Sequence, residues 1–131
     1  MEITSVIARF LLGLIFLVFG LNGFLNFIPM PPPTGVAGQF IGALFLSHSL
    51  IVIFAIQLIG AVLLLVNRYV PLALTVLAPI VVNILLFHLF MAPSGLPLAI
   101  LVTVLWVLAF VNVRSAFGGL LQQHVAAEEP R

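Results

Sequence analysis

The strongest constraint on this chain is the absence of charge from two long stretches. No Asp, Glu, Lys or Arg lies between Arg9 and Arg68, and none lies between Arg68 and Arg114. Charged residues make up 5% of the sequence and hydrophobic residues 64%, whereas soluble domains average about 25% and about 45–50%. A folded chain of this size still exposes about a third of its unfolded surface. That surface is too apolar for water, so we expect an integral membrane protein with the lipid bilayer as its surroundings.

Four apolar ranges are long enough to cross a bilayer as α-helices, since about 20 residues at about 1.5 Å each span its hydrocarbon core. They are 4–27, 48–66, 71–90 and 96–113. The second apolar stretch begins near Val36 and is too long for one crossing, but the polar Ser47-His48-Ser49 divides it into a short helix at 35–46 and a span. The sequence therefore predicts an all-α integral membrane fold, a four-transmembrane-helix bundle with a short re-entrant or interfacial helix between spans one and two.

The same pattern predicts one transmembrane domain at 1–117 and a short polar cytoplasmic tail at 118–131. With four crossings, Arg9, Arg68, Arg114 and Arg131 all fall on one side of the membrane. Cytoplasmic loops retain Lys and Arg, so both termini are predicted to be cytoplasmic. A fifth crossing would divide the arginines between the two sides, which favours four.

Several classes of function are disfavoured by composition. Four basic residues, dispersed along the chain, do not form the basic patch that binds nucleic acid. Cysteine is absent, and the two histidines in the spans are too few for a zinc site, which needs three or four protein ligands. No nucleophile triad, phosphate loop or carboxylate pair is present, so we expect no metal site, no catalytic residue and no independent catalytic activity.

Uncharged polar side chains gather in the outer half of the predicted spans, on the side opposite the arginines. They are Asn22, Asn26, Gln39, His48, Asn83 and His88. One interpretation is a cofactor pocket in which His48 or His88 hydrogen-bonds a quinone carbonyl, or ligates a haem iron or the magnesium of a chlorophyll-type pigment.

The alternative is that the same side chains only bridge helices as polar contacts, or lie at the level of the lipid headgroups. Asn22 and Asn26 are one turn apart and share a helix face. Asn83 and His88 diverge by about 140° on a regular helix, so one small ligand would not contact both unless the helix is distorted. The sequence leaves both interpretations open.

A second set of residues is predicted to pack helices together. Gln57 lies near the middle of span two and must find a hydrogen-bond partner there, and Gly60, one turn later, would let another helix approach closely. In the short helix, Gly38 and Gly42 belong to a stripe of small residues of the kind that packs membrane helices. Trp106 lies in the middle of span four, where it packs in the bundle or faces a ligand or partner.

Several segments resemble the DoxX family of small bacterial four-helix membrane proteins. The resemblance is carried by RFLLGLIF at 9–16, GLNGF at 20–24, PMP at 29–31 and QLIGAVLL at 57–64, and it extends over about 9–117. It implies a bacterial cytoplasmic (inner) membrane protein. Members of that family are linked to thiosulfate:quinone oxidoreduction or to oxidative-stress complexes.

The chain departs from the family pattern at two places. Gln57 stands where an acidic residue is common, and Asn22-Gly23 stands where a basic residue often follows the glycine. Both changes remove titratable groups, and glutamine cannot exchange a proton. A proton-coupled step carried by this chain is therefore not expected.

Three functional hypotheses follow. The chain is a DoxX-like, quinone-linked or non-catalytic accessory subunit of a membrane electron-transfer assembly, or a purely structural small subunit of a respiratory or photosynthetic complex, or a small-solute transporter. The last is weakened by the lack of intramembrane charge and of an inverted repeat. The expected partners are the lipid bilayer and other membrane subunits or further copies of the chain.

Overall fold

The computed structural model describes residues 2–130, which form helices and connecting segments with no β-strand among them. The helices are α1 (Ile3–Leu25), α2 (Gly35–Leu46), α3 (Ser49–Leu65), α4 (Val70–Phe90) and α5 (Leu96–Val113), with short 3₁₀ helices η1 (Pro93–Gly95) and η2 (Arg114–Leu121). The prediction of an all-α chain is confirmed. Each α-helix begins and ends within two residues of its predicted range.

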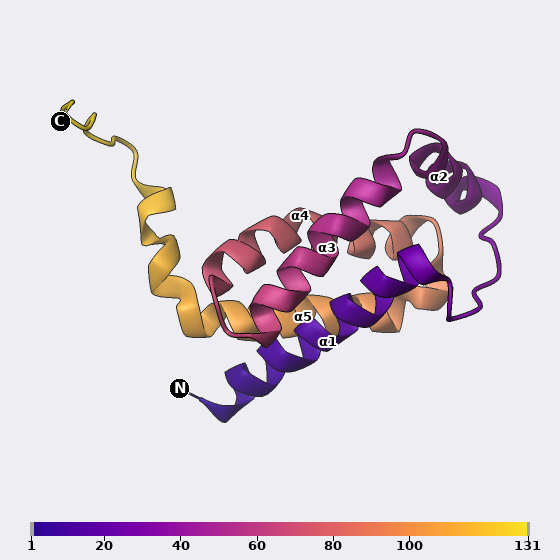
Figure 1. Cartoon of the computed structure of the whole chain (residues 1–131), viewed down its shortest axis with the longest axis horizontal. Helices are drawn as coiled ribbons and strands as arrows, with labels where there is room; N and C mark the ends of the chain where they lie inside the picture. Colours follow the sequence, from indigo (N-terminus) through magenta and orange to yellow (C-terminus); the bar gives the residue numbers. More distant parts are fainter. Residues whose placement is uncertain (1, 131) are drawn as a thin grey trace.

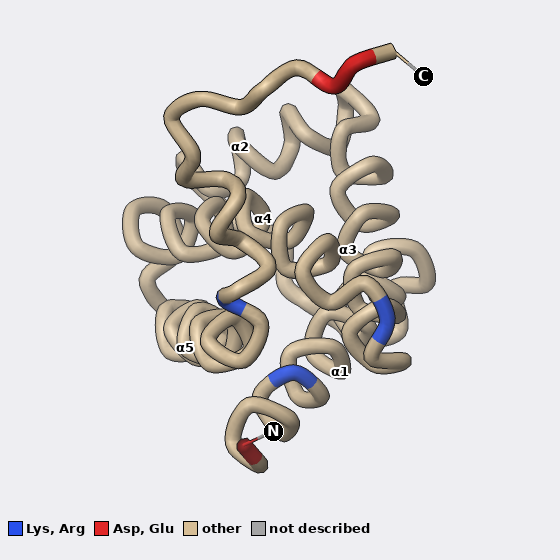
Figure 2. The backbone as a smooth tube through the Cα atoms, turned by 90° about the vertical axis from the view of Figure 1, so that its left-hand side faces the viewer, with Lys and Arg blue, Asp and Glu red and all other residues tan. Residues whose placement is uncertain are grey.

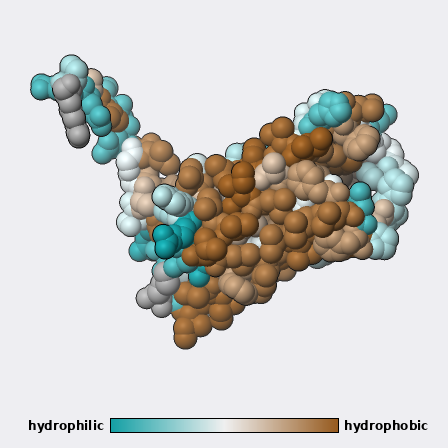
Figure 3. Space-filling view, in the orientation of Figure 1, coloured by the Kyte–Doolittle hydropathy of each residue, from teal (hydrophilic) through white to brown (hydrophobic). Residues whose placement is uncertain are grey.

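Three helical segments are each long and apolar enough to cross a membrane: α1, α4 and the run Pro93–Leu121 that includes α5. Helices α2 and α3 pass the same test only as a pair, and they are bent by 86° relative to each other. On the face shown in Figure 3, apolar side chains cover the middle of the molecule, and polar side chains gather toward its two ends. Residues 2–130 thus contain three such helices, or four if the bent pair forms one span.

The bend between α2 and α3 follows from local sequence. His48 has a φ of 65°, in the left-handed region that ends a regular right-handed helix. Ser47 Oγ donates to the Leu44 carbonyl oxygen over 3.2 Å and lies 2.9 Å from Ser49 Oγ. The bond to Leu44 satisfies a carbonyl that a continuous helix would pair with a backbone N–H, so the polar triplet ends one helix and starts the next.

The long helices α1, α3, α4 and α5 form an antiparallel bundle (Figure 1). Helix α1 packs against α3 and α5, and α4 packs against the same two helices from the other side. Helix α2 packs mainly on α3, and its Phe40 ring lies 5.8 Å from the Phe87 ring of α4. Helix η2 turns away from α5 beyond the bundle (Figure 1).

The two ends of the bundle differ in composition. At one end α1 begins, α3 passes to α4, and α5 ends, so Arg9, Arg68 and Arg114 gather there, and we call this the arginine end. Figure 2 looks at this end and shows its basic positions in blue. The opposite end, which we call the α2 end, comprises α2, η1 and the connection 26–34. Arg131, the fourth arginine of the topology prediction, lies outside the described residues.

Glycines of α1 bring it close to α3. A Cβ atom on Gly13, Gly20 or Gly23 would approach the side chain of Leu65, Leu58 or Phe54 to under 3.0 Å. Such small residues allow the backbones of membrane helices to approach each other. Small-residue packing was predicted in α2 and at Gly60, but this set in α1 was not predicted.

Two side chains also bond across the bundle to backbone carbonyls. Arg9 Nη1 donates to the Leu64 carbonyl oxygen in the last turn of α3, where a positive charge is favourable because helix carbonyls there have no helical partner. Trp106 Nε1 donates to the Leu74 carbonyl oxygen of α4 over 3.0 Å. Trp106 therefore packs within the bundle, which is one of the two roles predicted for it.

Candidate functional site

A cavity of about 590 Å³ lies between the long helices at the α2 end of the bundle. Its walls are mostly apolar and come from all four long helices, with Phe16, Phe54, Ile84 and Val102 among them. The connection between α1 and α2, and Phe45 of α2, complete the lining. Four polar residues also line it: Asn22, Asn26, Gln57 and His88.

Asn22 ties the connecting segment to α1. Its side-chain Oδ1 accepts a hydrogen bond from the Ile28 backbone N–H over 2.7 Å, and the residue is 9% exposed. Since an N–H group can only donate, the amide oxygen must face Ile28 and the amide nitrogen Nδ2 must point elsewhere. Within residues 2–130 that nitrogen has no hydrogen-bond partner.

Asn26 lies one turn beyond Asn22, where α1 ends. Its φ of 50° is left-handed, a conformation that Asn adopts more readily than most residues at helix ends. Its backbone N–H donates to the Asn22 carbonyl oxygen over 2.9 Å. The exposed side chain of Asn26 is therefore held at the edge of the bundle, where it lines the cavity.

Gln57 of α3 is 5% exposed, and its Nε2 donates to the Phe16 carbonyl oxygen of α1 over 3.3 Å. A carbonyl oxygen can only accept, so the amide nitrogen must face α1, and Oε1 is left without a partner in the described chain. Among residues 2–130, Arg9 Nε is the fully buried side-chain polar atom that lacks a partner. Gln57 Oε1 is thus not a fully buried atom, and Gln57 is among the residues that line the cavity.

His88 of α4 is half-buried beside the cavity. Its Nδ1 lies 2.8 Å from the Ile84 carbonyl oxygen, so Nδ1 carries the proton of that hydrogen bond. In the neutral ring, Nε2 is then an acceptor. The Cδ2–Nε2 edge packs against Gly95, where any Cβ atom would clash with it. His88 is thus positioned by its own helix and by the turn before α5.

The other predicted cofactor residues lie outside the cavity lining. Gln39 on α2, His48 at the α2–α3 bend and Asn83 on α4 are all exposed. Asn83 Nδ2 donates to the Pro79 carbonyl oxygen of its own helix over 2.9 Å. The structure therefore brings Asn22, Asn26 and His88 together and leaves Gln39, His48 and Asn83 apart.

The residues predicted to pack helices occupy different surroundings. Gly60 faces α4, where a Cβ would approach the Leu77 side chain to under 3.0 Å. Gly38 lies against the Pro33 carbonyl of the preceding segment, and Gly42 has no described atom within 4 Å of its ideal Cβ position. Gln57, predicted as a packing residue, bonds to α1 and lines the cavity as well. Gln57 was not predicted to join the outer polar residues, because the sequence of one helix does not show that the cavity extends to the middle of the span.

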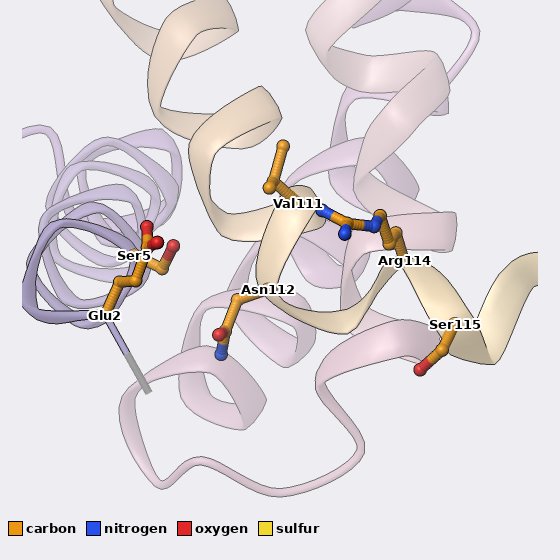
Figure 4. Close-up of a pocket in the computed structure, with 6 residues that line it drawn as sticks. All are labelled: Glu2, Ser5, Val111, Asn112, Arg114 and Ser115. Carbon is orange, nitrogen blue, oxygen red and sulfur yellow. The ribbon is translucent and has the colours of Figure 1, made fainter.

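A second pocket, of about 360 Å³, lies at the arginine end. Figure 4 shows Glu2 and Ser5 side by side near the start of α1, with Asn112 near the end of α5 and Arg114 and Ser115 at the start of η2. The pocket carries one acidic and one basic side chain, so its formal charge favours neither an anion nor a cation. The sequence analysis did not predict it, since its residues come from opposite ends of the chain.

No three His, Asp or Glu side chains among residues 2–130 are arranged to hold a metal ion. Compared with known proteins, the chain matches no protein-family model, and it has no significant match among curated proteins or solved structures.

Proposed function

We propose that the chain is a bacterial inner-membrane protein that crosses the membrane four times. Helix α3 is one of the four crossings, and α2 is a short re-entrant or interfacial helix. The apolar middle of the molecule supports membrane insertion (Figure 3). The arginine end supports the orientation, because basic residues are retained in the cytoplasm. With that orientation both termini are cytoplasmic, and the cavity lies in the outer half of the membrane.

The cavity at the α2 end binds a quinone-type ring, and the chain serves as a DoxX-like, quinone-linked accessory subunit of a membrane electron-transfer assembly. The observation that carries this proposal is a cavity of about 590 Å³ with apolar walls and a few amide and imidazole groups. Small-molecule sites have this composition and volumes of about 300–1,000 Å³. A quinone ring with its prenyl tail combines an apolar body with two polar oxygens, which matches such a lining.

The hydrogen bonds of the cavity favour a ligand over simple helix bridging. If the amides only joined helices, their polar atoms would be paired with other helices. Asn22 Nδ2 and Gln57 Oε1 instead lack partners in the described chain. Unpaired polar groups are costly in surroundings of low polarity, so a bound molecule that satisfies them gains affinity.

The chain contributes binding and positioning rather than chemistry of its own. The described residues that line the cavity include no carboxylate, and in this proposal the electrons are exchanged with a partner subunit. This is the reason for assigning the chain an accessory role in an assembly.

The test is purification of the tagged chain from native membranes in mild detergent, followed by extraction and quantification of quinone. We expect near-stoichiometric quinone in the wild type and in Asn83→Leu, whose side chain lies outside the cavity. Asn22→Leu, which removes the unpaired donor, is expected to lose most of the quinone. Quinone content equal to that of the surrounding lipid in all three proteins would contradict the proposal.

One observation favours a second candidate, a structural subunit of a larger complex. Gly35 and Gly42 of α2 have no described atom within 4 Å of their ideal Cβ positions, and Phe45 and Leu46 are exposed on the same helix. A small-residue face of this kind suits close packing by another membrane helix. Co-purification of a defined subunit that is lost in Gly42→Leu, with no quinone in the preparation, would favour this role.

A further inference from the structure

Backbone groups fix the orientation of the polar side chains that line the cavity. The Ile28 N–H can only donate, and the Phe16 and Ile84 carbonyls can only accept. Each therefore dictates which atom of Asn22, Gln57 or His88 must face it. The atoms left over define a pattern of donors and acceptors that a ligand must match.

This pattern contains one amide nitrogen and one amide oxygen, on deeply placed side chains, that have no hydrogen-bond partner among residues 2–130. Asn22 is 9% exposed and keeps Nδ2 free to donate, and Gln57 is 5% exposed and keeps Oε1 free to accept. In its neutral form, His88 offers Nε2 as a further acceptor, although that edge of the ring packs on Gly95. The second N–H of Gln57 Nε2 also remains free, so the three side chains offer a ligand both donors and acceptors.

We infer that the cavity binds the reduced, hydroxyl-bearing form of a quinone-type ring more tightly than the oxidised form. A quinol hydroxyl donates to Gln57 Oε1, and a ring oxygen accepts from Asn22 Nδ2. This inference rests on the proposed function, since it specifies the redox form that the same cavity prefers.

The oxidised ring does not fit the same pattern because both of its oxygens are carbonyls, which only accept. A quinone can accept from Asn22 and from the second N–H of Gln57, but neither of its oxygens can donate, so Gln57 Oε1 stays unpaired. A buried acceptor without a donor costs more than a neutral hydrogen bond gains, and one missing bond corresponds to about a tenfold loss of affinity. The reduced ring avoids this loss.

The experiment measures equilibrium binding of decylubiquinol and decylubiquinone, separately and without oxygen, to the full chain in lipid nanodiscs, with empty nanodiscs subtracted. We expect the quinol to bind about tenfold more tightly, which raises the midpoint potential of the bound two-electron couple by about 30 mV relative to the free couple. Equal binding, or tighter binding of the quinone, would overturn the inference while leaving a quinone site in place. Binding of neither form above empty nanodiscs would overturn the proposed function together with it.

A variant pair assigns the preference to Gln57. Gln57→Met keeps a side chain of similar length but removes the acceptor, so the ratio of the two affinities should fall from about tenfold to about one. Gln39→Met makes the same change on an exposed side chain of α2 and should leave the ratio unchanged. The thermal stability of Gln57→Met is measured in parallel, and the wild-type ratio tests the inference even if this variant does not fold. A preserved ratio in folded Gln57→Met would contradict the role of its Oε1.

Discussion

The arginine end and the α2 end of the bundle contain similar numbers of apolar helices but fill the space between them differently. Toward the arginine end, Leu12, Leu64, Leu74 and Leu77 are fully buried in one continuous core. Toward the α2 end, a cavity of about 590 Å³ lined partly by amides lies between the same helices. The closely packed arginine end stabilises the bundle, and the α2 end has room to bind a ligand.

The largest expected change in the free energy of unfolding comes from creating a cavity in the closely packed half of the bundle. Leu74→Ala removes a fully buried side chain and should lower the free energy of unfolding by about 2–5 kcal/mol. The measurement is reversible unfolding of the purified chain in mixed detergent micelles. Leu98→Ala, at an exposed residue that lines the cavity, is the matched control and should cost well under half as much. Equal losses would mean that the two halves are packed alike.

A smaller effect is expected where α1 and α3 approach each other. Gly23→Ala places a methyl group against the Phe54 ring and should destabilise the chain by about 1–3 kcal/mol, as overpacking does. Gly42→Ala, in open space on α2, should instead stabilise it by about 0.5–1 kcal/mol through helix propensity. Both are measured as shifts in the same unfolding equilibrium, and shifts of the same sign would contradict the close contact.

At the arginine end, Arg9→Gln should cost about 1 kcal/mol, because it removes the positive charge beside the Leu64 carbonyl in the last turn of α3. Arg114→Gln changes an exposed arginine and should have no measurable effect on stability. If the two variants have the same free energy of unfolding, the bond from Arg9 to α3 does not contribute to stability.

A small gain in stability should also come from filling the cavity. Ala99 is buried and lines it, so Ala99→Leu adds apolar atoms in unoccupied space and should stabilise the chain by about 0.5–1 kcal/mol. The same variant should lose bound quinone. Retention of quinone at the wild-type level would show that the ligand lies elsewhere.

The helices were predictable because each depends on local sequence. Apolar runs, Pro71 at the start of α4 and the Ser47-His48-Ser49 triplet determine where helices begin and end, and none of these signals needs knowledge of the neighbouring helices. The 86° bend at the triplet follows from the same local signal.

The composition of the cavity was predictable only in part. Depth along a helix can be read from the sequence, so Asn22, Asn26 and His88 were grouped with other outer residues. Which side chains face the cavity depends on how each helix is rotated about its axis, and the weak amphipathic pattern of these helices does not specify that rotation. Asn83 therefore turned out to bond to its own helix, and Gln57 to line the cavity from mid-span.

The indole of Trp106 gives the protein an internal optical reporter. It is the single tryptophan of the sequence, it is hydrogen-bonded to α4 and stacked on Phe110 with ring centroids 5.3 Å apart, and it lies one helical turn from the cavity-lining Val102. Indole emission responds to the polarity and hydrogen bonding around the ring. A shift of α5 relative to α4 as the cavity fills is therefore expected to change the wavelength of the intrinsic fluorescence of the protein.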